Sequence, residues 1–343
     1  MKKTSLVVSI LLILAITVAA QPGTVLLNGA GATFPYPMYS KWFDVYHQKD
    51  PNIQINYQSI GSGGGIRQVL AGTVDFGASD GPMNDDQIKE FKEKRGTDIL
   101  HFPTVLGADV PTYNIAGVTG ELNFTQKAIA GIFLGTITKW NDPEIAKPNP
   151  GVNLPSSDIL VVHRSDGSGT TYVWTDFLSK ISPEWKTKVG FGTSVNWPLG
   201  VGGKGNEGVA GLVKQTPNTL GYVELVYAIQ NNMPYGKVQN ADGKFVKADL
   251  AGVTAAAAGA AKNMPNDFRV SITNAPGATS YPVSSFTWLL IPAQIPDAAK
   301  RDAIKGFLTW MLSDGQNYTE ALAYARLPKP VVEKELKAIS LVK

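Results

Sequence analysis

The chain has 343 residues, of which 43% are hydrophobic, and its formal net charge at pH 7 is +3. This apolar content excludes a disordered chain, and the near balance of charges excludes a surface built for nucleic acid or for a membrane. The sequence contains no cysteine, which also excludes disulfides, thiolate metal sites, thiol nucleophiles and a lipid anchor on cysteine.

The first twenty residues have the pattern of a secretory signal peptide. Lys2 and Lys3 form a positive start, residues 6–16 are almost continuously apolar, and small residues at 18–20 precede Gln21. The apolar run is too short for a membrane anchor, and a buried N-terminal helix is the alternative. We therefore expect residues 1–20 to be removed on export, and the rest of the chain is long enough for two lobes.

Short apolar runs alternate with helical patterns along the rest of the chain, which predicts an α/β architecture with sheets covered by helices. The predicted strands are Ile53–Tyr57, Val74–Ala78, Ile99–Val105, Ile159–Arg164, Leu220–Val223, Val270–Thr273 and Ser285–Ile291. The predicted helices are 36–48, 66–71, 172–180, 251–262, 297–312 and 330–341. The region from Trp140 to Trp197 is rich in Pro and Gly and is interpreted as long surface loops of one lobe.

Four short segments rich in Gly, Ser and Thr carry the functional signal, at 29–34, 61–65, 77–80 and 164–170. All but 77–80 immediately precede a helical pattern. The start of a helix leaves backbone N–H groups unpaired, glycine lets a ligand approach them, and Ser and Thr hydroxyls donate at the same place. Each segment alone is an ordinary helix cap with turn glycines. Three of them together favour the binding of an oxyanion.

Charged residues in these segments indicate which kind of oxyanion would bind. Arg164 offers a planar fork of donors to an oxyanion, and Asp166 can hold that fork in position. Asp80 would repel a fully ionised anion but can accept the O–H of a protonated one. Phosphate carries a proton near neutral pH and sulfate does not, so Asp80 predicts selection against sulfate.

Six segments resemble the phosphate-binding proteins of bacterial ABC phosphate-uptake systems, and the resemblance extends over nearly the whole chain beyond the signal peptide. They are GAGATFPYPMYSKW (29–42), YQSIGSGGGIRQ (57–68), VDFGASD (74–80), FPTVLG (102–107), RSDGSGT (164–170) and VGGKGNEGVAG (201–211). The resemblance implies that hydrogen bonds alone hold phosphate between two lobes. The implied ligands are Thr33, the backbone N–H of Phe34, Ser62, Asp80, Arg164, Ser168, the backbone N–H of Gly169, and Thr170, with Asp166 paired to the arginine.

The resemblance also implies the organisation of the protein. It implies a type II periplasmic-binding-protein fold, with one lobe formed by 21–107 and 283–343 and the other by 108–282. We expect a monomeric, non-enzymatic protein of the periplasm that needs no cofactor or metal and binds no nucleic acid. It would deliver inorganic phosphate to the membrane permease of an ABC importer.

Other functions remain open at this level. Residues 77–81 match the G-x-S-x-G nucleophile elbow, with Ser79 as the nucleophile and His47, His101 and His163 as the available bases. Residues 200–205 match G-x-G-x-x-G, but no strand is expected before them, which disfavours a dinucleotide site. A hydrolase or phosphatase on the same scaffold, and a binding protein for another oxyanion such as sulfate, are the alternatives.

Overall fold

The computed structural model describes residues 23–118 and 120–343, and the expected signal peptide lies outside the described residues. The strands are β1 Val25–Gly31, β2 Ile53–Ser59, β3 Phe76–Ser79, β4 Ile99–Asn114, β5 Asn123–Phe124, β6 Leu160–Arg164, β7 Val201–Gly203, β8 Thr219–Glu224, β9 Lys237–Gln239, β10 Phe245–Val246 and β11 Ser284–Pro292. The α-helices are α1 Tyr36–Lys49, α2 Ser62–Ala71, α3 Asp85–Arg95, α4 Gln126–Leu134, α5 Pro143–Ala146, α6 Gly169–Ile181, α7 Pro183–Lys188, α8 Gly205–Gln215, α9 Leu225–Gln230, α10 Leu250–Lys262, α11 Ala298–Met311 and α12 Lys329–Ala338. Short 3-10 turns follow at Asp314–Tyr318, Glu320–Leu322 and Ile339–Leu341.

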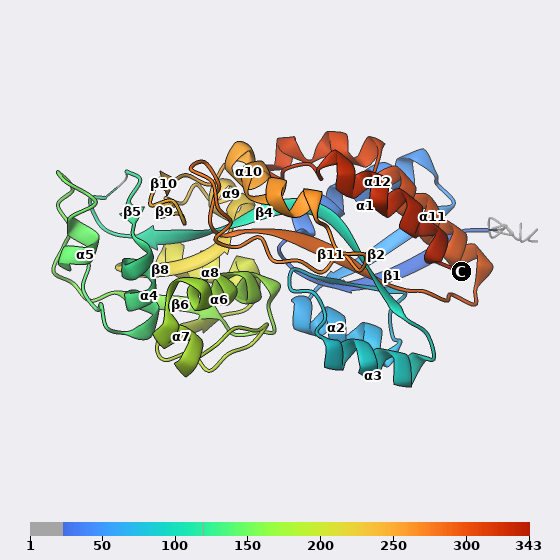
Figure 1. Cartoon of the computed structure of the whole chain (residues 1–343), viewed down its shortest axis with the longest axis horizontal. Helices are drawn as coiled ribbons and strands as arrows, with labels where there is room; N and C mark the ends of the chain where they lie inside the picture. Colours follow the sequence, from blue (N-terminus) through green and yellow to red (C-terminus); the bar gives the residue numbers. More distant parts are fainter. Residues whose placement is uncertain (1–22, 119) are drawn as a thin grey trace, which may run out of the picture.

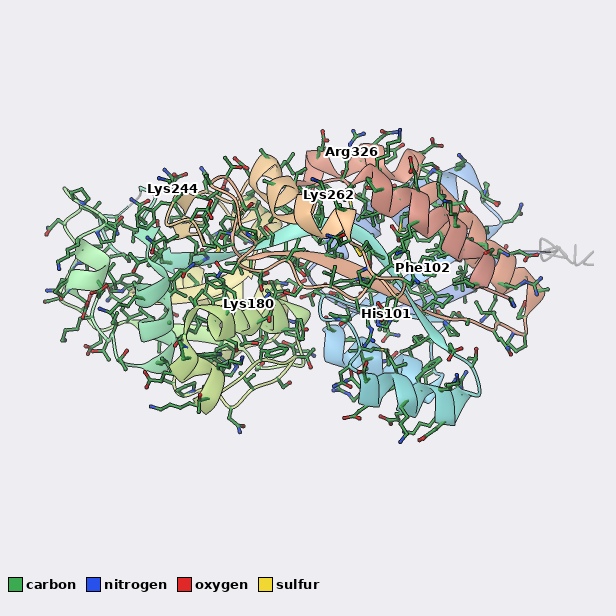
Figure 2. The ribbon with its side chains drawn as sticks, viewed as in Figure 1. His101, Phe102, Lys180, Lys244, Lys262 and Arg326 are labelled. Carbon is green, nitrogen blue, oxygen red and sulfur yellow. The ribbon has the colours of Figure 1, made fainter. Side chains whose placement is uncertain are left out.

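The molecule is elongated and has two lobes, each a sheet flanked by helices (Figure 1). The strand order of the continuous sheet is β2-β1-β3-β11-β4-β8-β6-β7. Strands β1, β2 and β3 are parallel in one lobe, and β6, β7 and β8 are parallel in the other. In Figure 2 the labelled His101 and Phe102 lie in the first of these lobes, while Lys180 and Lys244 lie in the second.

Strand β4 connects the lobes because it changes partner along its length. Its residues 99–108 pair with β11, and Asp109–Asn114 pair with β8, antiparallel in both cases. The N–H of Asp109 donates to the carbonyl of Val283, just before β11 begins. The expected two-lobed α/β fold is thus confirmed. The change of partner lies near the expected boundary at 107/108, while the exact limits of the lobes stay a prediction.

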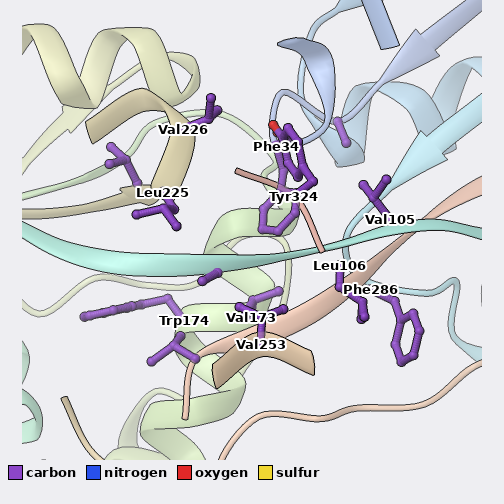
Figure 3. Close-up of a cluster of buried hydrophobic side chains, with 14 of the residues drawn as sticks. Phe34, Val105, Leu106, Val173, Trp174, Leu225, Val226, Val253, Phe286 and Tyr324 are labelled. Carbon is purple, nitrogen blue, oxygen red and sulfur yellow. The ribbon is translucent and has the colours of Figure 1, made fainter. Parts of the chain in front are cut away.

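Buried apolar side chains continue across the junction of the lobes. Figure 3 shows Phe34 beside Tyr324 near β4, with Leu225 and Val226 on the side of the second lobe. The ring centroids of Phe34 and Tyr324 are 6.4 Å apart, and the hydroxyl of Tyr324 donates to the carbonyl of Phe34 at 2.6 Å. The turn that carries Thr33 and Phe34 is therefore fixed by aromatic packing and by this hydrogen bond.

Two predictions about local structure are wrong. Val270–Thr273 forms no strand, since its backbone pairs with no strand of either sheet, and the segment is held by the hydroxyls of Ser271 and Thr273, which donate to Asp176 at 2.5 Å each. The region 140–197 is not mainly surface loop either. Besides the strand and helix expected there, which form β6 and α6, it contains α5 and α7, and the indole rings of Trp140, Trp174 and Trp185 are buried in the core of the second lobe. Within the described ranges, no helix is long and apolar enough to cross a bilayer.

Candidate anion-binding site

Four helices begin at one place, at the junction of the two lobes. Helix α1 follows the turn that holds Thr33, α2 begins with Ser62, α6 begins just after its cap Ser168, and α8 begins at Gly205. A helix start carries unpaired N–H groups and partial positive charge, so this convergence concentrates donors at one point. The polar side chains at this point are buried, with exposed fractions of 3% or less: Thr33, Ser62, Asp80, Arg164, Ser168 and Thr170.

The lobes are in close contact at α6. A Cβ atom on Gly169 would lie 2.3 Å from Oδ2 of Asp80 and 2.4 Å from Oγ of Ser62, so only glycine lets α6 approach these groups. Nearby, the N–H of Gly63 donates to the carbonyl of Gly167 at 2.9 Å. The residues expected in the site from both halves of the sequence are thus brought together, in a closed arrangement of the lobes.

Asp80 follows β3 and has two differently placed oxygens. Its Oδ1 accepts a hydrogen bond from the hydroxyl of Thr287 at 2.7 Å, while Oδ2 faces Ser62 and Gly169. Burial raises the pKa of Asp80 to about 7, although the bonds from Thr287 and Ser62 and the charge of Arg164 oppose that rise. Asp80 is therefore a carboxyl group whose Oδ2 accepts only a long hydrogen bond, 3.4 Å from Oγ of Ser62, and can share a proton with a neighbouring oxygen.

Arg164 ends β6 and is held in a fork-to-fork pair with Asp166. Its Nε donates to Oδ1 at 2.8 Å and its Nη2 to Oδ2 at 2.6 Å, and Nη1 donates to the hydroxyl of Thr170 at 3.2 Å. Burial disfavours the charge of Arg164, but Asp166 outweighs it, so the pKa of Arg164 is raised and that of Asp166 is lowered. Three of the five guanidinium N–H groups are engaged in this way, which leaves two for a ligand.

Neutral donors dominate the rest of the site. Because Asp166 offsets the charge of Arg164, an anion here depends on hydroxyls and backbone N–H groups. Among the described residues, the N–H groups of Phe34 and Gly169 have no protein acceptor. Such a set binds a small oxyanion by directed hydrogen bonds with little net charge.

The structure places every residue expected in the site at this junction, although their contact with a ligand stays a prediction. Sequence reasoning missed Thr287, which orients Asp80, and Asn206, which donates to the hydroxyls of Thr33 and Thr170 at 2.8 and 3.1 Å. It also missed Tyr227, whose hydroxyl donates to the carbonyl of Thr33 at 2.6 Å. The signal for Asn206 was available, since a glycine-rich segment precedes it at a helix start.

The competing motifs have other roles in the structure. The hydroxyl of Ser79 donates to the carbonyl of Gly81, and Nε2 of His101 accepts the N–H of Met83 at 3.1 Å. Burial lowers the pKa of His101 to about 3, which makes it a poor general base. A short strand, β7, lies within the 200–205 motif, where none was expected, but the N–H of Gly205 at the following helix start donates to Asp166. No group of three or more metal-ligating side chains lies within the described part of the chain.

Comparisons with known proteins find relatives over most of the chain. The family model for the PBP superfamily domain matches residues 18–315. The phosphate-binding protein PstS of Xylella fastidiosa is 46% identical over 321 residues, covering 93% of this chain and 86% of that protein. The protein of the same name from Pasteurella multocida is 45% identical, covering 93% and 90%. A solved high affinity periplasmic phosphate-binding protein bound with phosphate shares the fold, with a TM-score of 0.72 at 20% identity over 91% of this chain and 93% of that one.

Proposed function

The chain belongs to the PstS family of phosphate-binding proteins, and we propose that it holds inorganic phosphate at the junction of its lobes, through the donors described above. Its function is to bind phosphate for an ABC phosphate transporter. The proposed ligands are Thr33, Phe34 (N–H), Ser62, Asp80, Arg164, Ser168, Gly169 (N–H) and Thr170.

One observation supports phosphate over other oxyanions, namely that the carboxyl group of Asp80 is buried directly among the donors of Ser62 and Gly169. Oδ2 of Asp80 faces Gly169 and Ser62, with Oδ1 already occupied by Thr287. A ligand oxygen that carries a proton donates to Oδ2. When Asp80 is ionised, at a pH above its pKa of about 7, a bare oxygen would face Oδ2 lone pair to lone pair, which costs several kcal/mol or roughly a thousandfold in affinity. Sulfate has no proton to donate near neutral pH and is therefore disfavoured.

The arrangement also suggests how phosphate is captured and passed on. Thr33, Ser62 and Asp80 belong to one lobe, and Arg164 and Thr170 belong to the other. A ligand that contacts both sets stabilises the closed state, because the open state cannot offer both at once. We propose that this closed, monomeric form is the one that an importer in the membrane recognises, after export and removal of residues 1–20. The relatives named phosphate-binding proteins support a role in binding a substrate rather than in catalysis.

Calorimetry on the purified protein tests the proposal. The protein is unfolded and refolded to strip bound phosphate, assayed for residual phosphate, and titrated with phosphate and then with sulfate. Tight phosphate binding with sulfate at least ~100-fold weaker is expected. Sulfate binding of equal strength would favour a general oxyanion-binding protein, and binding of neither anion would refute the proposal.

A further inference from the structure

The start of helix α8 adds a polar side chain to the site that none of the expected ligands includes. Asn206 is fully buried and lies in the first turn of α8. Its Nδ2 donates to the hydroxyl oxygen of Thr33 at 2.8 Å and to that of Thr170 at 3.1 Å. One amide group therefore contacts two proposed ligand hydroxyls, one from each lobe.

The orientation of this amide is fixed by its other end. Oδ1 of Asn206 accepts the backbone N–H of Glu224 at 3.0 Å. A backbone N–H can only donate, so the oxygen of the amide must face Glu224 and its NH₂ group must face the two threonines. Rotating the amide by 180° would oppose donor to donor at Glu224 and would leave both hydroxyls without the donor that they now accept from.

The threonine hydroxyls are consequently limited in what they can do. Each uses a lone pair to accept from Asn206, and Thr170 also accepts from Nη1 of Arg164 at 3.2 Å. The hydroxyl of Thr170 accepts two bonds and that of Thr33 accepts one, and in neither case can the hydroxyl proton point at the donor that it accepts from. For both threonines, that proton is directed away from the amide and is available to the ligand.

We propose that Asn206 is a positioning residue for phosphate, which acts by turning the hydroxyl protons of Thr33 and Thr170 toward the ligand. This inference rests on the proposed function, because it assumes that both hydroxyls contact the ligand. It divides the site into a donor side, set by Asn206, and an acceptor side at Asp80. A protonated tetrahedral anion then binds in a single orientation, with its unprotonated oxygens at the threonines and its protonated oxygen at Asp80.

Substitution of the amide by a carboxylate gives a sharp test. In Asn206→Asp, Oδ1 still accepts from Glu224, and the second oxygen accepts from the threonine hydroxyls, so every group stays paired. The hydroxyl protons now point to residue 206 and away from phosphate. Two charge-assisted hydrogen bonds are lost, and phosphate binding should weaken by roughly 100-fold or more. Asn206→Leu leaves the hydroxyls free to turn and should cost less, about 10-fold.

The new carboxylate would also repel the anion, so a double-mutant cycle separates the two effects. Calorimetry compares Asn206→Asp in the wild type and in a Thr170→Val background. Repulsion between the new carboxylate and phosphate weakens binding equally in both backgrounds. The loss caused by turning the hydroxyl proton of residue 170 away from phosphate occurs only where Thr170 is present. The loss should therefore be about 10-fold smaller in the Thr170→Val background. Asn263→Asp, at an exposed position after α10, makes the same chemical change as a control.

The outcomes distinguish this inference from the proposed function. Circular dichroism and thermal melting first establish that each variant is folded, with Asn206→Leu available if Asn206→Asp is not. Equal losses in both backgrounds, or a Leu variant weaker than the Asp variant, would overturn the positioning role while phosphate binding by the wild type stands. No binding by the stripped wild type would overturn the proposed function and this inference with it.

Discussion

Replacing Asp80 by Asn should remove most of the discrimination between phosphate and sulfate. In the wild type, Thr287 donates to Oδ1 and leaves Oδ2 facing the ligand side, at Ser62 and Gly169. In Asp80→Asn, the amide oxygen would keep the bond from Thr287, and the NH₂ group would take the place of Oδ2. The acceptor for a protonated oxygen thus becomes a donor to a bare one.

The size of the change in affinity follows from one hydrogen bond that phosphate loses and one that sulfate gains. Loss of a bond to a charged group costs about 1.5–3 kcal/mol, so phosphate should weaken by roughly 10- to 150-fold. Sulfate should gain a comparable amount, because a repulsive contact is replaced by a donor. The ratio of the two dissociation constants should therefore fall by about 100-fold or more.

The assay is competitive calorimetry on phosphate-stripped protein, with Asp86→Asn, an exposed residue of α3, as the matched control. The control should leave both affinities unchanged. An unchanged ratio in Asp80→Asn would refute the reasoning, because it would mean that Oδ2 faces no ligand oxygen. A parallel loss of both anions would likewise contradict a selective role for this carboxyl.

Three further predictions follow from the same geometry. Arg164→Lys should weaken phosphate binding by roughly 10-fold or more, since a point charge cannot pair with Asp166 and the ligand together, and wild-type affinity by calorimetry would argue against this. Solution scattering of stripped protein should show a smaller radius of gyration once phosphate is added, whereas identical profiles would indicate a rigid, preformed site. Glu335 is buried without a hydrogen-bond partner, and burial raises its pKa, so the folded protein keeps a proton that the unfolded chain loses above about pH 4.3. Between the unfolded pKa and the raised folded pKa of Glu335, the free energy of unfolding of Glu335→Gln should therefore rise relative to wild type by ~1.4 kcal/mol per pH unit in urea titrations, and a pH-independent difference would contradict it.

Local patterns in the sequence were enough to predict the elements that bear the site. The turns before α1 and α6 and the start of α2 are recognised by glycine and hydroxyl residues next to an amphipathic pattern. Asp80 and Arg164 follow from their charge within those segments. What brings them together is the change of partner along β4, which depends on pairings between residues far apart in the sequence.

The failures have a common physical origin. The sequence predicts no strand at Val25–Gly31, because its glycines and Asn28 weaken the local β signal, yet the segment forms parallel ladders with both β2 and β3. Val270–Thr273 has the local signal of a strand but no partner in space. Thr287 acts through a contact 207 residues away along the chain, which no local pattern can indicate. The glycine-rich helix start before Asn206 is visible in the sequence, but its partner Thr33, 173 residues away, is not.

The most direct test of the central claim is a pair of crystal structures, of the stripped protein and of the same protein with phosphate. With phosphate, one tetrahedral ligand should lie between α2 and α6, with an oxygen within hydrogen-bond distance of Asp80 and others at Arg164, Thr33 and Thr170. In the stripped form, one lobe should be rotated relative to the other about the point where β4 changes its partner strand. A phosphate bound elsewhere, or one that contacts residues of a single lobe only, would contradict the account.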